Sequence, residues 1–475
     1  MVMISINQQD ELPLVEQVVR GVSRQIDERV LRQGARLPSI RQFANDHRVS
    51  RFTVVQAYDR LVAAGYLESR QGSGFYVSKP VDAVAANEAA CDLDRAVDIL
   101  WLLRQSMQQR QFELMPGCGW LPPEWQDASA LQRGLRTLAR GRSRALVEYG
   151  NAFGYLPLRQ DLQQRLGELE IAASPNQIVT THGVSQALDL LFRYFIRPGD
   201  KVLVEDPAYF NLFGPLKLLG AELIGVPRNQ DGPDTAKLEQ LIQQHHPKLM
   251  ITTAVLHNPT GTCISQAVAY RLLQLAEKYQ LMIIEDDIYG DFHGGRATRL
   301  AALDQLNRVI YVSSFSKTIS ASVRVGYLAC HPDLAQELVD LKLLTQLTSC
   351  ETSERLIHQI LSEGHYRKSM MRLRSRLERA REQTIGPLES LGMGLYAEPE
   401  YGFFLWTRLP SGCEWNAAEL AHRALESEMM LAPGNIFSPQ QSISPWLRFN
   451  AAFCADQPQV FERLKPLLEC AASDE

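Results

Sequence analysis

Long hydrophobic runs are absent from this sequence of 475 residues. No segment approaches the roughly 20 consecutive apolar residues that a membrane-spanning helix requires. The first residues also lack the basic start and apolar core of a secretory signal. Hydrophobic residues make up 45% of the chain and charged residues 22%, which excludes fibrous and wholly disordered classes. We expect a protein that works in the cytoplasm and has no membrane partner.

Cysteine pairs with the spacing of metal ligands or of a disulfide framework are missing as well. The eight cysteines are scattered over the chain, and no two of them form a C-x-x-C pair. The adjacent His245 and His246 have no further ligand at metal spacing. We therefore expect reduced thiols and no metal site.

Acidic residues are scarce in one block near the start of the chain. The formal net charge is −5, yet residues 31–79 hold eight Lys and Arg against three Asp and Glu. A basic block on an acidic body indicates a segment that meets a polyanion such as DNA. A solvated helix face would explain the same charges, so the motifs must decide between the two interpretations.

The first segment has the pattern of three short helices and a hairpin. Residues 14–32 place an apolar residue at every fourth position, which predicts a helix with one buried face. Pro38 and Ser39 suit the start of a second helix, because proline fits a first turn and serine caps free backbone amides. A third helix is predicted to begin after Ser50. Its core face consists of Val54, Tyr58 and Leu61. The following stretch, GYLESRQGSGFYV, alternates around Gly72 and predicts a β-hairpin.

Three helices followed by a hairpin form the winged helix-turn-helix plan. In that plan the N-terminal residues of the second motif helix lie nearest the base edges of the major groove, and the wing lies against phosphates. The candidate DNA-binding residues are Arg41, Ser50, Arg51, Thr53 and Gly72. A three-helix cap that serves only for dimerisation or docking would have the same helices, but it would not need basic residues at the positions that face DNA.

This segment resembles the GntR-type winged helix. The resemblance rests on LPSIRQ, on SRFTVVQAYDRL and on the glycine-bearing wing RQGSGFYV. It covers almost the whole of residues 1–79 and implies double-stranded DNA as a partner. The sequence departs from the pattern at Phe52, a bulky apolar residue among the positions expected to face the groove.

We divide the chain into a DNA-binding domain at residues 1–79, a linker at 80–92 and a large domain at 93–475. The linker is rich in alanine and has no strong apolar period. A frayed helix that continues into the helical pattern of 93–110 is the alternative, and the sequence leaves both open.

In the large domain, short apolar stretches alternate with helical ones. This alternation predicts an α/β fold with a mostly parallel central sheet covered by helices on both faces. Ligands of such sheets bind beyond the carboxyl ends of the strands. Five predicted strands are each followed by a polar cluster. The clusters are Gly183-Val184-Ser185, Asp206–Tyr209, Asn258–Gly261, Asp286–Tyr289 and Ser314–Lys317.

The residues of these clusters fit the chemistry of pyridoxal 5'-phosphate (PLP). Backbone amides at 183–185 open a helix and can hold a phosphate, with Ser314, Ser316 and Arg324 as further donors. Lys317 lies at an interior strand end, where a desolvated lysine readily forms a Schiff base. A carboxylate such as Asp286 can keep a pyridine nitrogen protonated, which makes PLP an electron sink. Asn258 and Tyr289 can reach the phenolic oxygen of the ring.

HNPTG, EDDIY, SSFSKTISASVRVGY and WLRFN resemble fold-type I aminotransferases, which have the aspartate aminotransferase-like fold. The resemblance covers most of residues 110–460. It implies that Lys317 is the catalytic lysine, that Tyr209 stacks on the cofactor ring and that Arg448 binds a substrate carboxylate. Tyr149, in EYGNAFGYLPLR, is similar to a residue that reaches the phosphate site of the other subunit.

The complete chain resembles the MocR subgroup of GntR regulators. That resemblance implies a transcription factor that senses an amino acid, an amine or PLP itself. It also implies a head-to-tail, domain-swapped homodimer that reads two DNA half-sites. A functional aminotransferase with an accessory DNA-binding domain is the alternative, because the matched residues leave transamination open.

Overall fold

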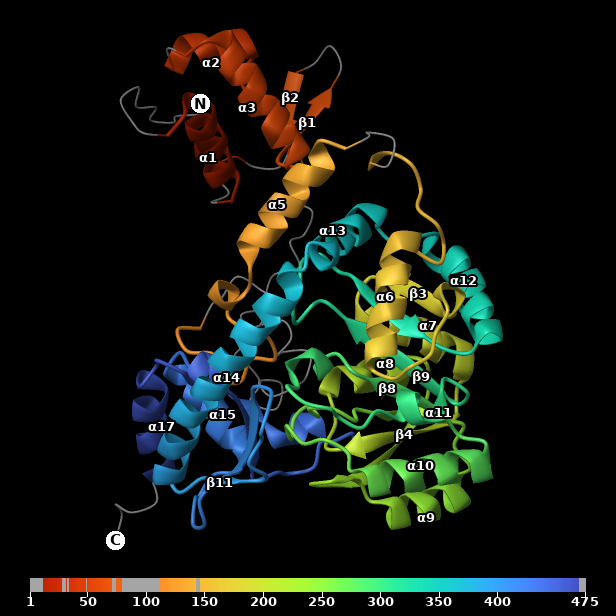
Figure 1. Ribbon diagram of the computed structural model, residues 1–475. Helices are drawn as coiled ribbons and strands as arrows, with labels where there is room; N and C mark the ends of the chain where they lie inside the picture. Colours follow the sequence, from red (N-terminus) through yellow and green to blue (C-terminus); the bar gives the residue numbers. More distant parts are fainter. Residues whose placement is uncertain are drawn as a thin grey trace. The chain divides into compact units, whose positions relative to one another are not determined.

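The computed structural model describes residues 12–27, 31, 34–47, 49–70, 74–78, 112–141 and 146–469 (Figure 1). The chain divides into two compact units, Met1–Asp92 and Leu93–Glu475. The predicted linker 80–92, the helical pattern of 93–110 and the wing residue Gly72 lie outside the described residues. The domain boundaries at 79 and 92 therefore stay a prediction.

The described residues of the small unit form three helices and a two-stranded antiparallel sheet. Its elements are α1 (Leu14–Asp27), α2 (Ile40–His47), α3 (Arg51–Ala63), β1 (Leu67–Arg70) and β2 (Gly74–Val77). Val54, Tyr58 and Leu61 are fully buried, as their spacing on α3 predicted. The predicted cap of α2 is confirmed, because the Ser39 hydroxyl accepts a hydrogen bond from Gln42 N at 3.2 Å. Ser50 caps α3 in the same way, since its hydroxyl accepts a hydrogen bond from Thr53 N at 3.0 Å.

The large unit is built on an eight-stranded sheet in the order β3-β10-β9-β8-β7-β4-β5-β6. The strands are β3 (Ile178–Thr181), β4 (Lys201–Asp206), β5 (Glu222–Asn229), β6 (Gly232–Pro233), β7 (Leu249–Thr252), β8 (Met282–Asp286), β9 (Val309–Ser314) and β10 (Gly326–Ala329). Pairing is parallel from β5 through β4, β7 and β8 to β9, whereas β10 runs antiparallel to both β9 and β3. The predicted mostly parallel sheet is confirmed.

Successive side chains of each strand point to opposite faces of this sheet, and both faces are apolar. Helices therefore cover both faces. On β4, for example, Val202 and Val204 belong to one apolar cluster, and Leu203 belongs to the other. The first cluster is completed by α7 (Val184–Phe195), α8 (Phe213–Leu218) and α12 (Pro332–Gln346). The second cluster is completed by α6 (Leu156–Glu168), α9 (Thr235–His245), α10 (Gln266–Tyr279), α11 (Leu300–Asp304) and α13 (Glu351–Ser362).

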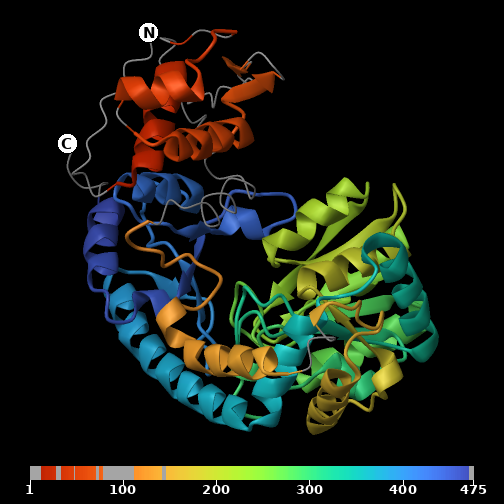
Figure 2. The ribbon, with the colours of Figure 1, turned by 90° about the horizontal axis from the view of Figure 1, so that it is seen from above.

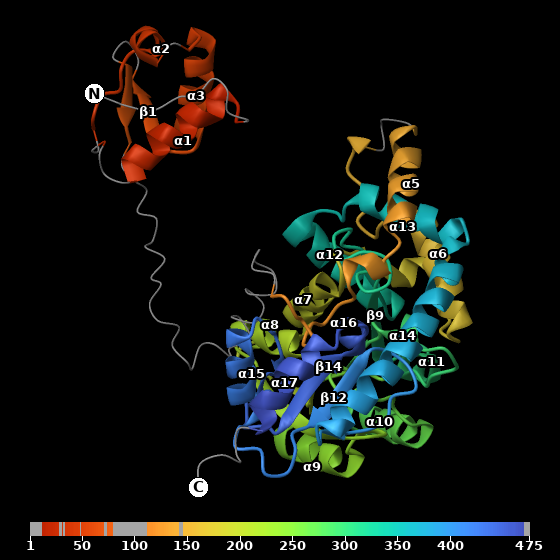
Figure 3. The same cartoon turned by 90° about the vertical axis from the view of Figure 1, so that its left-hand side faces the viewer.

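A second, antiparallel sheet follows near the C-terminus. Its strands are β11 (Gly394–Leu395), β12 (Phe404–Arg408), β14 (Trp446–Asn450) and β13 (Ala432–Pro433), in that order. The other α-helices of the described residues are α5 (Ala128–Ala139), α14 (His365–Ser390), α15 (Ala417–Glu426), α16 (Ala451–Cys454) and α17 (Gln459–Glu469). Figures 1 and 3 show α14 as a long helix that runs from the region of α13 to the second sheet, and Figure 2 shows its curvature. Within the described residues, no helix is long and apolar enough to cross a membrane.

Candidate functional site

The carboxyl ends of the strands bring most of the predicted site residues together. Because β10 is antiparallel to both β3 and β9, β3 points the same way as the parallel strands. The ends of β3, β4, β7, β8 and β9 therefore share one edge of the sheet. Contacts and electrostatic influence link Asn258, Asp286, Tyr289, Lys317 and Arg448 at this edge.

Lys317 follows β9 and is enclosed by the protein. Its ammonium donates a hydrogen bond to the main-chain oxygen of Gly119, with Nζ and O separated by 2.8 Å. Burial lowers the pKa of Lys317 to about 8, and the nearby positive charge of Arg448 acts in the same direction. A lysine with this pKa supplies a substantial fraction of neutral amine near neutral pH, which is the form that attacks a carbonyl carbon.

Asp286 is the last residue of β8 and only 4% of it is exposed. Its Oδ1 accepts a hydrogen bond from Ile288 N at 3.1 Å, but none of the described cationic side chains forms an ion pair with it. Burial raises its pKa to about 7. A buried carboxylate in this position is completed by a cationic partner, and the protonated nitrogen of a pyridine ring is such a partner.

Arg448 enters the site from β14 and is buried between two aromatic rings. Its guanidinium carbon lies 4.5 Å from the ring centre of Phe404 and 4.9 Å from that of Phe437. Nη1 donates to Asn258 Oδ1 at 2.7 Å, whereas Nε has no hydrogen-bond partner. Burial lowers the pKa of Arg448 to about 10, so the group stays charged at neutral pH. An enclosed cation of this shape binds a carboxylate at two points.

Two tyrosine hydroxyls border the same space. Tyr289 accepts a hydrogen bond from Asn258 Nδ2 at 3.4 Å, and its ring packs edge-on against Phe404. Burial raises the pKa of both Tyr289 and Tyr209, so both phenols are neutral donors near neutral pH. Asp286 influences both of these pKa values. This influence indicates that Tyr209 lies near the end of β8, and its role in stacking on a ring stays a prediction.

The predicted phosphate-binding residues form a cradle at the start of α7. Gly183 is the residue before the helix and has φ +77°, and none of the side chains there caps the free amides of Val184 and Ser185. The predicted third amide, that of Gly183, donates instead to Thr181 O at 2.9 Å. Arg324 donates to His182 O at 3.0 Å and lies so close that a Cβ on Gly183 would be 2.8 Å from its Nη2. Unpaired amides at a helix start beside a guanidinium form a binding site for an anion.

Ser314 and Ser316 extend toward the same strand end. The Ser314 hydroxyl donates to Ser316 Oγ at 2.9 Å and accepts from Ser316 N at 3.0 Å. Both serines are buried. This turn orders the residues that immediately precede Lys317.

Tyr149 is the one predicted site residue of the large unit that the structure leaves apart. It is 83% exposed, and no hydrogen bond or ring contact among the described residues joins it to the others. Its neighbour Val147 is exposed as well, as are Leu344 and Leu347 at the end of α12. Lys342 of α12 donates to the main-chain oxygen of Ala152 at 2.8 Å, which holds this helix end beside the segment that follows Tyr149.

Residues 116–120, which the sequence analysis missed, form a wall of the site. Gly117 O accepts from Arg448 Nη2 at 2.6 Å, and Gly119 O accepts from Lys317. Asn450 holds the segment in place, since its Nδ2 donates to Cys118 O at 3.0 Å and its backbone N donates to Pro116 O at 2.7 Å. The two glycines that flank Cys118 were the available signal. A Cβ on Gly117 would lie 2.5 Å from the main-chain carbonyl carbon of Leu431, so no side chain fits there.

A second set of residues that the sequence did not reveal supports the turn of Asn258. Glu205 accepts from Arg228 Nη1 at 2.8 Å and lies 2.8 Å from His257 Nε2. Arg228 and His257 lower the pKa of Glu205 to about 2, and burial lowers the pKa of His257 to about 4. The imidazole is therefore neutral, with Nδ1 2.9 Å from the Thr260 hydroxyl. This buried network orients the turn that carries Asn258.

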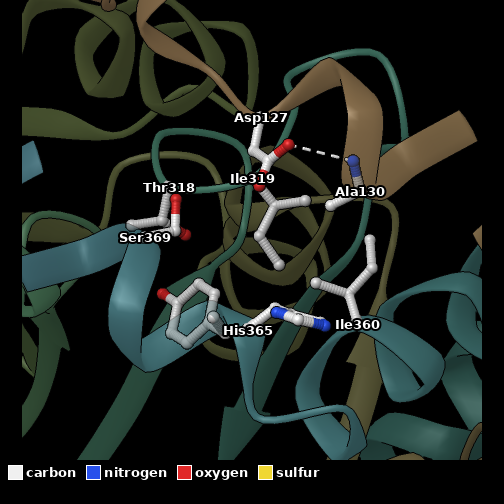
Figure 4. Close-up of a pocket in the computed structure, with 8 residues that line it drawn as sticks. Asp127, Ala130, Thr318, Ile319, Ile360, His365 and Ser369 are labelled. Atoms are coloured by element: carbon white, nitrogen blue, oxygen red, sulfur yellow. Dashed lines mark hydrogen bonds between the residues drawn. The ribbon is translucent and has the colours of Figure 1, made fainter. Parts of the chain in front are cut away.

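A separate pocket lies on the other side of the residues that follow Lys317. It is lined by Asp127, Ala130, Thr318, Ile319, Ile360, His365, Tyr366 and Ser369. Figure 4 shows these side chains around one opening, with Asp127 engaged by the amide of Ala130. None of the predicted site residues lines this pocket.

In the small unit, the predicted DNA-binding residues lie at the starts of two helices. Arg41 is exposed in the first turn of α2, and Arg51 is exposed at the first residue of α3. Ser50 and Thr53 are joined through their hydroxyls, with 2.7 Å between the oxygens. Phe52 is exposed beside them.

Comparisons with known proteins match both units. Residues 14–77 match the family "Bacterial regulatory proteins, gntR family", and residues 121–459 match "Aminotransferase class I and II". The uncharacterized HTH-type transcriptional regulator YisV of Bacillus subtilis (strain 168) is 26% identical over 95% of this chain and 95% of its own length. The probable rhizopine catabolism regulatory protein MocR of Rhizobium meliloti is 29% identical over 78% of this chain and 76% of its own.

A solved structure is similar to the large unit. It is LysN, the alpha-aminoadipate aminotransferase of Thermus thermophilus, in complex with N-(5'-phosphopyridoxyl)-L-leucine. The TM-score is 0.68 and the identity 28%, and the alignment covers 75% of this chain and 92% of LysN.

Proposed function

Because this chain belongs to the class I and II aminotransferase family and carries a GntR-family domain at its N-terminus, we propose that it is a PLP-dependent transcriptional regulator of the MocR type. In this proposal the small unit binds double-stranded DNA, and the large unit senses an amino acid or an amine. The protein then works in the cytoplasm, where bacterial DNA lies. The observation that carries the proposal is the co-occurrence, in one chain, of a GntR-family domain and an aminotransferase-family domain.

The residues present fit PLP. The amides of Val184 and Ser185, with Ser314, Ser316 and Arg324, would hold its phosphate. Lys317 would bind its carbonyl carbon, and Asp286 would pair with its ring nitrogen. Asn258 and Tyr289 would bind the phenolic oxygen, and Tyr209 would stack on the ring. When bound, PLP withdraws electrons from the α-carbon of an amino compound. The buried and otherwise unpaired carboxyl of Asp286 is the strongest single support for this fit.

Arg448 gives the site its preference for ligands with a carboxylate. The guanidinium binds the carboxylate at two points, and the rings of Phe404 and Phe437 exclude water from the ion pair. Asn258 holds Nη1 in position from one side. Lys317 Nζ, with its pKa near 8, can accept and return a proton at neutral pH.

The carbonyl oxygen of Gly117 accepts a hydrogen bond from Nη2 of Arg448, so a carboxylate that binds this nitrogen must compete with that carbonyl. Lys317 likewise binds Gly119 O. A ligand that binds both cations releases the contacts of the 116–120 segment with Arg448 and Lys317, while the contacts with Asn450 remain. In sequence this segment lies closest to the linker among the described parts of the site. We assign it the task of conveying ligand occupancy toward the DNA-binding unit, a coupling that requires the ligand to favour one of two conformations.

The regulator acts as a homodimer in this proposal, because two half-sites need two reading helices. The exposed apolar residues Val147, Tyr149, Leu344 and Leu347 support an interface there. Such an interface would bring Tyr149 to the phosphate cradle of the partner subunit. An extended linker of 13 residues spans about 40 Å at ~3.3 Å per residue. That length permits the head-to-tail, domain-swapped arrangement.

The test is a footprint of the purified PLP-bound protein on DNA upstream of its own gene and of the neighbouring genes. It is run with and without a panel of amino acids and amines. We expect a protected pair of half-sites whose occupancy changes with one compound. Absence of protection at every fragment, in the presence and absence of the panel, would contradict the regulator.

A functional aminotransferase is the second candidate, and the presence of both Lys317 and Arg448 in one enclosed site favours it. The assay is single-turnover conversion of the bound cofactor by each amino donor, followed by steady-state turnover with a keto acid. Efficient steady-state turnover without specific DNA binding would establish the enzyme. A single half-reaction that alters DNA binding would establish chemistry used for sensing.

A further inference from the structure

Packing within the small unit does not explain why a large apolar side chain stands at Phe52. It lies in the first turn of α3 and is 69% exposed. The core face of α3 is formed by Val54, Ala57, Tyr58 and Leu61, all fully buried. At about 100° per residue, Phe52 lies about 170° from the centre of that face. The ring therefore points directly away from the body of the small unit.

The polar neighbours of Phe52 are already engaged with each other. Ser50 caps α3 through Thr53 N, and the two hydroxyls of Ser50 and Thr53 are joined at 2.7 Å. Arg51 is exposed beside Phe52. Gln56 is exposed one turn farther along, on the same side of the helix as Phe52. Within the first turn of α3, the side chains of Arg51 and Phe52 are exposed, whereas that of Thr53 is half-buried, so this turn presents mainly a cation and an apolar ring.

In the major groove, thymine offers an apolar group, its C5-methyl, at the base edge. The other readable atoms of the four bases there are hydrogen-bond donors and acceptors. We propose that Phe52 selects a thymine in each half-site by packing its ring on this methyl group, while Arg51 supplies the charge that holds the helix start in the groove. The proposal rests on the DNA-binding function proposed above and names a base that this function reads.

The position of Gln56 on α3 predicts which base lies near the thymine in the half-site. Side chains one turn apart on a helix are about 5–6 Å apart, and successive base pairs are about 3.4 Å apart. Gln56 therefore faces a base pair one or two steps from the thymine, where a glutamine side chain suits an adenine. Asp59 is on the same side but about 10 Å farther along the helix, at 1.5 Å per residue, outside the first turn.

The experiment begins with a duplex selected by the full-length PLP-bound protein from a random-sequence library. Each thymine of the selected half-site is then replaced, one at a time, by uracil, which removes only the methyl group. We expect one thymine per half-site at which the replacement weakens the wild-type protein about fourfold, from about 0.8 kcal/mol for one buried methyl-sized group. At that position Phe52→Ala should bind the thymine and uracil duplexes equally.

Two further variants test whether the effect comes from the apolar side chain at position 52. Phe52→Leu keeps an apolar side chain and should keep part of the preference for thymine over uracil. Leu218→Ala, which removes a side chain of the large unit that is 88% exposed, should behave as wild type. Because Phe52 is exposed, Phe52→Ala should leave the fold of the small unit intact, and circular dichroism verifies this.

The outcomes separate the two proposals. If uracil replacement has the same effect on wild type and Phe52→Ala at every position, Phe52 does not read thymine and instead contacts something other than that base. If the selection enriches no sequence and binding is equal on random DNA, the proposed DNA-reading function itself fails.

Discussion

Asp286→Asn tests the electrostatic reasoning at the centre of the candidate site. Burial raises the pKa of Asp286 from its ordinary 3.8 to about 7 in the protein without cofactor. Between these two pH values the unfolded chain has lost the proton and the folded chain keeps it. Folding is therefore increasingly disfavoured as the pH rises from about 4 to about 7, and the penalty is constant above that.

The size of this penalty follows from the same two pKa values. The interval from 3.8 to about 7 corresponds to about 4 kcal/mol, at about 1.4 kcal/mol for each tenfold change in proton affinity. Asparagine resembles the neutral carboxyl and does not ionise. Asp286→Asn should therefore stabilise the cofactor-free protein by up to about 4 kcal/mol at pH 8 and by less than about 1.4 kcal/mol near pH 4.5.

The assay is chemical denaturation of the cofactor-free protein at pH 4.5, 6 and 8, for the wild type, Asp286→Asn and Asp340→Asn. Asp340 is exposed on α12, so its substitution should not change the pH profile. The same Asp286→Asn variant should bind PLP more weakly, because the ring nitrogen loses its anionic partner. A variant whose stability relative to wild type does not change between pH 4.5 and pH 8 would refute the reasoning.

Three further substitutions test the remaining assignments. Lys317→Ala should abolish the visible absorption of the protein-bound cofactor, and an unchanged spectrum would show that another group binds it. Gly117→Ala should keep that absorption but weaken carboxylate ligands about tenfold or more in a titration, because the new Cβ would lie 2.5 Å from the main-chain carbonyl carbon of Leu431 and would displace the 116–120 segment. Equal affinity would show that this segment is not part of the ligand site. Arg51→Ala should weaken binding to the selected duplex by about 1–3 kcal/mol if Arg51 contacts a base, whereas an equal loss on random DNA would make it a phosphate contact.

The parts of the site that could be predicted are those carried by short segments at strand ends. Asp286 ends the apolar strand β8 and Lys317 follows the apolar strand β9, and parallel strands bring their carboxyl ends to one edge. The strand β10 could not be found in this way. It is four residues long, follows a polar turn, and pairs antiparallel between β9 and β3, so no alternation of strand and helix marks it.

The role of Tyr149 could not be tested in the same way, because it depends on a second subunit. Its motif was readable from the sequence, yet its side chain is exposed in a single chain. A role that depends on a second copy leaves no trace in the contacts of one copy. The same reasoning applies to the wing residue Gly72, which lies outside the described residues.

The order of the two units, the α/β class and the Ser39 cap of α2 could be predicted from the sequence and are confirmed. The chemistry assigned to Lys317 and Asp286 from their positions, and to Arg448 from the family resemblance, stays a prediction. These depend on periodicity and on short motifs, which act over a few residues. Only the tertiary structure decided that the carbonyls of Gly117 and Gly119 contact Arg448 and Lys317, across separations of 331 and 198 residues. It also decided that Glu205 and His257 form the buried support of Asn258. The physical reason is that these contacts depend on strand order and on burial, which no local pattern encodes.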